Sequence, residues 1–296
     1  MLSILIPTYN YNVYPLARQL EQQAINVSIN FELICFDDGS NSVLNIENEK
    51  INNLTNCKFV AIKQNVGTSK NRNALVEVSI YEYVLFIDGD SLLPDDKFIK
   101  RYIDGLKIDI DVIYGGTVYL KNIKQKQKLR WKYGVKREVL TAQEREKELF
   151  KCLLFNNTIV RKYFFQTLGF EKTITQYGHE DTIFAFDLQK HNASLKHINN
   201  PVIHCGIDSN ISFINKTKYS LENLNSIYKT HLIDSNFITI LRIFIKLKRF
   251  KLNYLLAFIH KIFYPFLKYN LISKNPSLLI FDLFRLSYFC HINLKK

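Results

Sequence analysis

The chain has 296 residues, enough for one large domain or for a domain with an appendage. Its composition, with 47% hydrophobic and 23% charged residues, is typical of a soluble globular protein. The five cysteines lack paired spacing, so they suggest neither a zinc site nor a disulfide framework, and they fit a reducing cytoplasm best. The net charge of +13 lies mainly near the C-terminus. Residues 216–296 hold 14 Lys and Arg and 3 Asp and Glu, whereas residues 1–215 hold 26 Lys and Arg and 24 Asp and Glu. An apolar run begins at residue 2 with no basic segment before it, so we expect no signal peptide and a site that faces the cytosol.

Short apolar runs alternate with helical patterns through the first half of the chain. Four runs rich in β-branched and aromatic residues predict buried strands at residues 2–6, 31–36, 58–62 and 83–87. Apolar residues at helical spacing predict helices between them, over residues 13–24 and 73–78. This alternation is typical of a doubly wound, mostly parallel α/β sheet.

Polar clusters follow three of the predicted strands, at residues 7–10, 37–40 and 88–90. Ligands on such sheets bind beyond the carboxyl ends of the strands, so we expect the three clusters to converge at one edge. Asp88 and Asp90 flank a glycine, and their carboxylates can hold a hard divalent cation that neutralises a diphosphate. An acidic turn without function is an equally good interpretation of this motif by itself.

Two further segments suggest a nucleotide ligand. One carboxylate of the pair Asp37 and Asp38 can accept the N3 hydrogen of a uracil ring, and residues 65–73 form a glycine turn that opens a helix with cations in its first turns. The chain contains neither the GxGxxG fingerprint nor a GxxxxGK[ST] loop, which argues against the usual dinucleotide and P-loop sites.

The remaining regions differ in character. Residues 121–151 are highly charged with weak apolar periodicity, which predicts an exposed helix or a mobile loop, and a globular pattern then resumes and ends near residue 215. Residues 237–263 carry apolar side chains at helical spacing opposite a basic stripe, which predicts a basic amphipathic helix. Its longest run without charged residues is too short to cross a bilayer. We expect this tail to lie on the inner face of the cytoplasmic membrane; the alternative is a helix packed on the catalytic domain with a solvated basic face. The predicted domains are residues 1–215, catalytic, and residues 216–296, a helical basic tail.

Six motifs occur in a characteristic order: SILIPTYN at 3–10, DDGS at 37–40, NVGTSKNRN at 65–73, DGD at 88–90, GHED at 178–181 and PVIH at 201–204. Each motif is weak alone, but the ordered series over about 210 residues resembles the family 2 glycosyltransferases with the GT-A fold. The stretch LRWKYGVKR at 129–137, together with residues 156–157 and 178–182, also looks like a bacterial subgroup associated with surface polysaccharide assembly.

The resemblance implies a role for each matching position. Asp181 would be the general base that deprotonates the acceptor hydroxyl in an inverting displacement, and Glu180 would orient the acceptor or support the base. Asp88, Asp90 and His204 would contact the metal, and the imidazole makes Mn²⁺ as suitable as Mg²⁺. The implied donor-binding residues are Pro7, Thr8, Tyr9, Asp37, Asp38, Gly67, Arg72 and Asp88. Without the motif series, Glu180 and Asp181 would be interpreted as a favourably charged helix N-terminus.

Five residues are weaker candidates for contacts with the acceptor or the donor sugar. Trp131 and Tyr133 can stack on a sugar, although a structural role is equally consistent with the sequence. Asn156 and Asn157 can contact a sugar or form a simple turn. His179 stands where the family often has an aromatic residue or glycine, which leaves acceptor specificity open.

The leading hypothesis is an inverting, metal-assisted hexosyl- or N-acetylhexosaminyltransferase that moves a sugar from a UDP-sugar to a bacterial surface glycan or a lipid-linked acceptor. A nucleotidyltransferase that makes nucleotide sugars is the first alternative, but such enzymes generally use a glycine-rich basic first loop, and here that turn is PTYN at 7–10. A non-enzymatic basic adaptor is the second alternative. Basic charge confined to an amphipathic helix suits a lipid surface better than nucleic acid, so we expect no nucleic-acid partner and a peripheral location at the cytoplasmic membrane.

Overall fold

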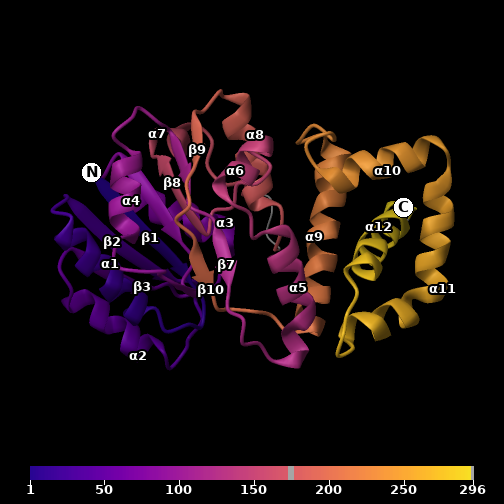
Figure 1. The fold of residues 1–296 in the computed structure, drawn as a ribbon, viewed down its shortest axis with the longest axis horizontal. Coiled ribbons are helices and arrows are strands. Elements are labelled where there is room, and N and C mark those ends of the chain that lie inside the picture. Colours follow the sequence, from indigo (N-terminus) through magenta and orange to yellow (C-terminus); the bar gives the residue numbers. More distant parts are fainter. Residues whose placement is uncertain (173–176, 295–296) are drawn as a thin grey trace. The chain divides into compact units, whose positions relative to one another are not determined.

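Ten strands lie in the N-terminal two thirds of the computed structural model, which describes residues 1–172 and 177–294 (Figure 1). Their bounds are β1 Leu2–Thr8, β2 Phe31–Asp37, β3 Cys57–Ala61, β4 Tyr83–Ile87, β5 Ser91–Leu92, β6 Val112–Tyr114, β7 Thr117–Tyr119, β8 Asn157–Arg161, β9 Leu195–His197 and β10 Val202–His204. Seven of them form one sheet in the order β3-β2-β1-β4-β8-β6-β9. Only β8 runs antiparallel to its neighbours among these seven, so the predicted mostly parallel sheet is confirmed.

Helices of this first unit, which comprises residues 1–120, 138–172 and 180–206, connect the strands. Their bounds are α1 Tyr14–Asn26, α2 Asn45–Asn48, α3 Thr68–Val78, α4 Phe98–Gly105, α6 Ala142–Arg145, α7 Tyr163–Thr167 and α8 Glu180–Lys190. The four predicted strands and the helix predicted over residues 13–24 match observed elements to within two residues, whereas the helix predicted over residues 73–78 begins earlier, at Thr68. Apolar periodicity located these elements because each buries an entire face against the sheet.

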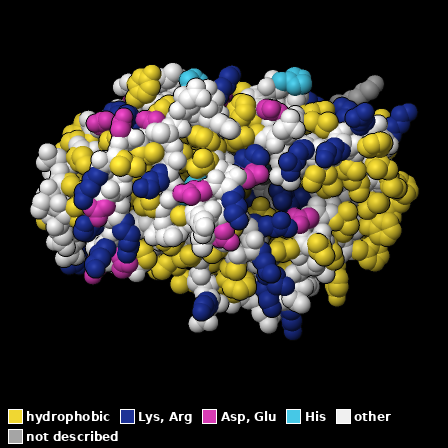
Figure 2. Space-filling model, turned by 45° about the horizontal axis from the view of Figure 1, so that its top comes forward, with side chains coloured by type: hydrophobic (Ala, Val, Ile, Leu, Met, Phe, Trp, Pro, Cys, Tyr) yellow, Lys and Arg dark blue, Asp and Glu magenta, His cyan; other side chains and the backbone are white. Residues whose placement is uncertain are grey.

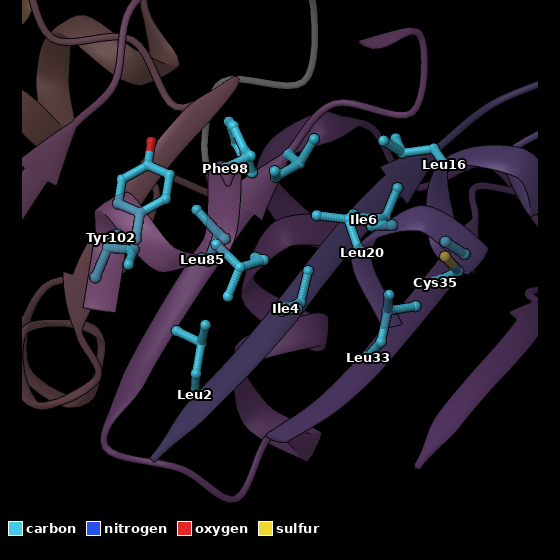
Figure 3. Close-up of a cluster of buried hydrophobic side chains, with 14 of the residues drawn as sticks. Leu2, Ile4, Ile6, Leu16, Leu20, Leu33, Cys35, Leu85, Phe98 and Tyr102 are labelled. Carbon is cyan, nitrogen blue, oxygen red and sulfur yellow. The ribbon is translucent and has the colours of Figure 1, made fainter. Parts of the chain in front are cut away.

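The main core lies between the sheet and helices α1 and α4 (Figure 3). Side chains alternate along β1, so Leu2, Ile4 and Ile6 all point to this side, where Leu20 of α1 and Phe98 of α4 cover them. Each is fully buried. Burial of an aliphatic or aromatic side chain contributes about 1.5–3 kcal/mol, so this layer holds the edge of the sheet rigid.

Aromatic side chains fill the opposite side of the sheet near α8. Phe86 of β4 packs with Phe155 and Phe170, and Phe170 in turn lies 4.8 Å, centroid to centroid, from Phe184 of α8. These edge and tilted contacts add to the apolar area that each ring buries. The cluster therefore anchors the first turn of α8 beside the end of β4.

A small second sheet stands beside the main one. It has the order β5-β10-β7, with β10 antiparallel to β5 and parallel to β7. In this register His204 lies opposite Ser91 on one side and Tyr119 on the other. The small sheet therefore places β10, the last strand of the first unit, beside β5, the short strand that follows β4.

The second unit is helical and comprises residues 121–137, 177–179 and 207–294. Its helices are α5 Lys128–Arg137, α9 Asn210–Thr230, α10 Thr239–Arg249, α11 Leu252–Ile272 and α12 Leu278–Leu294. A cluster of Leu129, Phe213, Leu271, Phe281 and Phe284 forms its core. No helix in the described residues is long and apolar enough to cross a membrane.

Two regional predictions need correction. Residues 121–151 are neither fully exposed nor a mobile loop, because Leu129 is completely buried in the helical unit and Arg145 is 2% exposed in the first unit. The single helix predicted over residues 237–263 is two helices, because Lys251 takes a left-handed backbone conformation with φ 59° between α10 and α11. Such a residue ends a helix, and side-chain periodicity carries no trace of it.

Candidate active site

The carboxyl ends of β1, β2 and β4 meet at one edge of the main sheet. The backbone N–H of Asp38 donates to the carbonyl of Thr8 at 2.9 Å, and the N–H of Gly89 donates to the carbonyl of Pro7 at 3.3 Å. The expected convergence of the three polar clusters is therefore confirmed. The edge between β1 and β4 is also where the strand order reverses, the position at which such sheets open a crevice for ligands.

Arg72 of α3 connects two of the predicted acids. Its guanidinium donates to Asp88 Oδ1 at 3.0 Å and to Asp181 Oδ1 at 2.6 Å, and the ring of Phe170 lies 5.3 Å from its Cζ. The side chain is 4% exposed, so the ion pairs are shielded from water on the arginine side. Burial opposes its charge, yet Asp181 and Asp88 together raise its pKa. The assignment of Arg72 to donor binding stays a prediction.

The acids at this edge are crowded. Burial raises the pKa of the Asp88 carboxyl to about 6; Arg72 opposes that shift, and the neighbouring Asp90 and Asp181 carboxylates reinforce it. A carboxylate held among like charges favours any ligand that brings positive charge to the site. The electrostatics of this edge therefore favour a cation near Asp88 and Asp90.

Asp181, the predicted general base, is held at the N-terminus of α8. Its Oδ1 accepts from Arg72, and its Oδ2 accepts from the backbone N–H of Phe155 at 3.0 Å. The side chain remains 22% exposed. Two donors on opposite oxygens fix the plane of the carboxylate, while its open side faces the solvent. Glu180, its neighbour, is buried.

The small sheet brings Asp90 and His204 together. Asp90 Oδ1 lies 3.3 Å from His204 Nδ1, and the N–H of Cys205 donates to the Asp90 carbonyl at 2.9 Å. The ring of Tyr119 packs edge-on against the imidazole at 5.5 Å. A carboxylate oxygen and an imidazole nitrogen that face each other at this distance form a ligand pair suited to Mn²⁺ or Mg²⁺.

Nowhere in residues 1–172 and 177–294 do three or more His, Cys, Asp or Glu side chains form a group that could hold a metal by themselves. Of the predicted metal ligands Asp88, Asp90 and His204, only Asp90 and His204 face each other. Asp88 directs its Oδ1 toward Arg72 instead. Magnesium sites in transferases commonly use one or two protein ligands and complete the shell with substrate phosphates and water. The pair fits that pattern.

Gly206 is a site residue that the motif analysis did not identify. A Cβ added to Gly206 would lie 1.9 Å from Asp90 Oδ2, closer than any real contact. Only glycine therefore leaves room for the Asp90 carboxylate in its observed position. The sequence shows only a glycine two residues after His204, the last residue of β10. Its role becomes clear only when the structure places Asp90 beside it.

Several buried oxygens at this edge have no hydrogen-bond partner within the described parts of the chain. They belong to Thr8, Asp37, Ser91 and Asn156. Buried polar atoms are normally paired, so a row of unpaired acceptors and hydroxyls beyond the strand ends is typical of a site for a polar ligand. Tyr9, immediately after β1, is 58% exposed and offers a ring beside them.

Asp38 organises the loop that precedes α3. Its Oδ1 accepts from the N–H of Val66 at 2.8 Å and its Oδ2 from the N–H of Gly67 at 3.0 Å. Both carboxylate oxygens are thus engaged by the backbone. Asp37 has Oδ2 bound to the N–H of Ser40 at 2.9 Å, and its Oδ1 is one of the unpaired atoms.

The weaker candidates divide between the two units. Asn157 is fully buried and donates to the carbonyls of Gly116 and Asn200, so it secures the turn between β6 and β7. Asn156 donates to Thr117 Oγ1 at 2.8 Å and keeps its Oδ1 unpaired.

Three candidates lie in the helical unit, and their assignment to the acceptor or the donor sugar stays a prediction. Tyr133 packs against Phe213 and Phe281 in that unit's core, whereas Trp131 is partly exposed. His179 adopts a left-handed backbone with φ 74°. Burial, with a contribution from Arg285, lowers the pKa of His179 to about 4, so the imidazole is neutral at pH 7.

Comparison with known proteins gives a consistent result. The model of the family described as glycosyl transferase family 2 matches residues 3–169. An uncharacterized glycosyltransferase of Haemophilus influenzae is 26% identical over 198 residues, which cover 62% of this chain and 78% of the relative.

Among solved structures, S. aureus TarS aligns with a TM-score of 0.51 and 19% identity over 77% of this chain; the match spans 43% of the TarS chain, less than half its length. The TarS fragment 1–349 in complex with UDP-GlcNAc aligns with a TM-score of 0.52 and 18% identity over 97% of this chain and 90% of the fragment. These structures share the fold. The family model covers more than half of the chain, so the protein belongs to glycosyl transferase family 2 and has its GT-A fold.

Proposed function

We propose that this protein is an inverting glycosyltransferase that moves a sugar from a UDP-sugar to a hydroxyl of a bacterial surface glycan or a lipid-linked acceptor. The observation that carries the proposal is the meeting of Asp88, Asp90, Asp181 and His204, four residues from three distant stretches of chain, at the ligand-binding edge of the sheet. The transferred sugar is proposed to be a hexose or an N-acetylhexosamine.

Donor binding is proposed at the ends of β1 and β2. The exposed ring of Tyr9 suits stacking on a base, and the unpaired oxygens of Thr8 and Asp37 suit the uracil or ribose. The loop that Asp38 holds at Val66 and Gly67 leads into the N-terminus of α3, an arrangement that favours phosphate. The UDP-GlcNAc bound to the TarS fragment supports a UDP-sugar as donor here.

Asp90 and His204 would hold a divalent cation, with Asp88 close by. When bound, such a cation neutralises the diphosphate leaving group as it accumulates charge. Asp90 is held in position by the backbone of Cys205 and by the space that Gly206 leaves, while Tyr119 orients the imidazole of His204. These residues therefore pre-organise the ligand pair, with Asp90 directly before β5 and His204 at the end of β10.

Asp181 would act on the acceptor. Its carboxylate takes the proton of the acceptor hydroxyl while that oxygen forms a bond to the anomeric carbon. The bond between the anomeric carbon and the diphosphate oxygen breaks, and its electron pair leaves with UDP. Arg72 and the N–H of Phe155 fix the carboxylate so that the lone pair on its open side faces the hydroxyl.

The proposal is tested by incubating the purified full-length protein with a series of UDP-sugars and following UDP release with Mn²⁺, with Mg²⁺ and with a chelator. Turnover is expected only with a cation, and Asp90→Asn is expected to lower it at least about tenfold, as for other metal-shell changes. Asp96→Asn is the matched control, because Asp96 is an exposed acid six residues farther along the chain. Full activity in chelator, or pyrophosphate release from a nucleoside triphosphate, would contradict the proposal.

Gly206→Ala gives a more local test of the same site. The added methyl group would lie 1.9 Å from Oδ2 and 2.7 Å from Cγ of Asp90, so it displaces this carboxylate, and its three nearest contacts are all with the Asp90 side chain. We expect the apparent affinity for Mn²⁺ in the turnover assay to fall on the order of 10–100-fold with little change in thermal stability. An unchanged metal affinity would show that Asp90 does not serve the cation.

A further inference from the structure

Helix α11 presents a broad apolar face to the solvent. Nine of its hydrophobic side chains are exposed by 41–77%: Leu252, Tyr254, Leu255, Phe258, Ile262, Phe263, Phe266, Tyr269 and Ile272. At 100° per residue these positions cover about half of the helix circumference. The opposite side, with Ala257, His260, Leu267 and Leu271, is buried in the helical unit. Figure 2 shows hydrophobic side chains gathered over the end of this unit that carries α11.

This face is unusual for a water-exposed helix. Single exposed apolar side chains are common, but a continuous set of this size marks a surface that is covered by another molecule. Within α11, Lys261 and Lys268 follow one edge of the apolar face, and Asn270 lies at the other edge. We name this surface, the nine exposed apolar residues with the two lysines, the α11 face.

The charge along the part of the chain that contains α11 is of one sign. Residues 235–281 contain no Asp or Glu, and their Lys and Arg residues are all exposed: Arg242, Lys246, Lys248, Arg249, Lys251, Lys261, Lys268 and Lys274. Pairing two copies of the α11 face would bring these cations together, which disfavours a symmetric dimer. An anionic lipid surface is complementary to both features, since it accepts apolar side chains below the headgroups and attracts cations at them.

The kinds of residue present also suit a lipid interface. Tyr254 and Tyr269 place a hydroxyl at the end of an apolar ring, and lysine side chains extend an apolar stem with a charged end, so both bridge lipid and water. Phe258, Phe263 and Phe266 supply the deeper apolar contacts. We propose that the α11 face docks the protein parallel to the surface of an anionic bilayer.

This placement refines the expectation of one basic amphipathic helix over residues 237–263. Leu241 and Phe244 of that range are buried within the helical unit, whereas Leu255 and Phe263 of the same range are exposed on α11, and the exposed apolar side chains continue to Ile272. The inference does not rest on the proposed reaction, because α11 belongs to the helical unit and none of the site residues of the first unit enters it. Failure of one proposal leaves the other standing.

The test uses the full-length protein and sedimentation with vesicles of phosphatidylcholine alone or with about one quarter phosphatidylglycerol. We expect binding to the anionic vesicles, release by high salt, and weak binding to neutral vesicles, because salt screens attraction over roughly 10 Å. No binding to anionic vesicles at low salt would overturn the proposal.

Two paired variants separate the contributions. Phe258→Gln with Phe266→Gln is expected to lower the vesicle partition coefficient at least about tenfold. Val43→Gln with Ile80→Gln changes apolar residues of the first unit that are at least as exposed, and it is expected to leave the coefficient unchanged. Lys261→Gln with Lys268→Gln is expected to weaken binding to anionic vesicles, and Lys190→Gln with Lys196→Gln is its control.

Circular dichroism and gel filtration accompany each variant. Both phenylalanines are exposed, so an unchanged melting temperature is expected and attributes lost binding to the α11 face. Equal partitioning of the phenylalanine variant and the wild type would overturn the proposal. The proposal would also be overturned if the wild type were a dimer and the phenylalanine variant a monomer with unchanged vesicle binding. The α11 face would then join two copies of the chain.

Discussion

Asp181→Asn is expected to lower kcat for sugar transfer on the order of 10²–10⁴-fold, the range typical for loss of a general base. Asparagine keeps the size and an acceptor oxygen for the N–H of Phe155, but its amide cannot take a proton from the acceptor hydroxyl. Donor affinity is expected to change little, because Asp181 lies on α8 and not on the strand ends proposed to bind the nucleotide. Steady-state kinetics and calorimetric titration with UDP measure the two quantities.

Asp187→Asn is the matched control for this variant. Asp187 is a partly exposed acid on the same helix, and neither Arg72 nor Phe155 contacts it within the described residues. It is expected to retain nearly full kcat. If Asp181→Asn turned over at a rate within a few-fold of wild type, Asp181 would not be the base, and the role of the ion pair with Arg72 would be structural.

Arg72→Leu is expected to have the largest effect on stability. Leucine fills part of the volume beside Phe170 but leaves Asp88 and Asp181 as two acids without their shared cation. Removing one member of a buried ion pair costs about 3–5 kcal/mol, and because the two acids are 33% and 22% exposed we expect about 3 kcal/mol. Urea denaturation followed by circular dichroism measures the free energy of unfolding.

The loss of unfolding free energy in Arg72→Leu is expected to be greater at neutral pH than at about pH 4. Protonation at the lower pH removes negative charge from Asp88 and Asp181, which no longer have a cation beside them. Asp88 already has a raised pKa of about 6 with Arg72 present, and its largest cause is burial. Arg18→Leu, an exposed arginine of α1, is the control and is expected to stay close to wild type. An Arg72→Leu protein as stable as the control would mean that water replaces the guanidinium at little cost.

Arg72→Lys distinguishes charge from geometry at the same position. Lysine restores one positive charge but cannot direct two separate N–H groups at Asp88 and Asp181. Part of the stability should therefore return, while kcat stays low, since the base loses its fixed orientation.

The strands and their polar ends were predictable because their signals are local. A buried strand requires consecutive apolar residues, and β1, β2 and β4 each end in residues that cannot remain in the core. Asp88 and Asp90 were identified in this way, whereas Asp181 was identified only from the order of motifs and the family that this order resembles. The pairings among them were not, since Arg72 and Asp181 are 109 residues apart in sequence.

The helical unit shows the opposite case. Helical periodicity located an amphipathic segment over residues 237–263, but it could not show that Leu241 would be buried while Phe258 would be exposed. Both are apolar, and only the packing of α10 and α11 against their neighbours decides which of them is covered. The break at Lys251 was not predicted, because lysine is a good helix former and its side chain does not signal the left-handed backbone conformation that it adopts here.

By itself, then, the sequence determined the first four strands of the main sheet and the helices between them, where the acidic clusters fall along them, and that basic charge gathers near the C-terminus. The tertiary structure decided which acid faces which cation, that Gly206 makes room for Asp90, and which apolar face of the helical unit stays open to solvent. The physical reason is range. Apolar periodicity reflects local backbone geometry, whereas ion pairs, close approaches and exposure depend on surfaces supplied by residues far away in the chain.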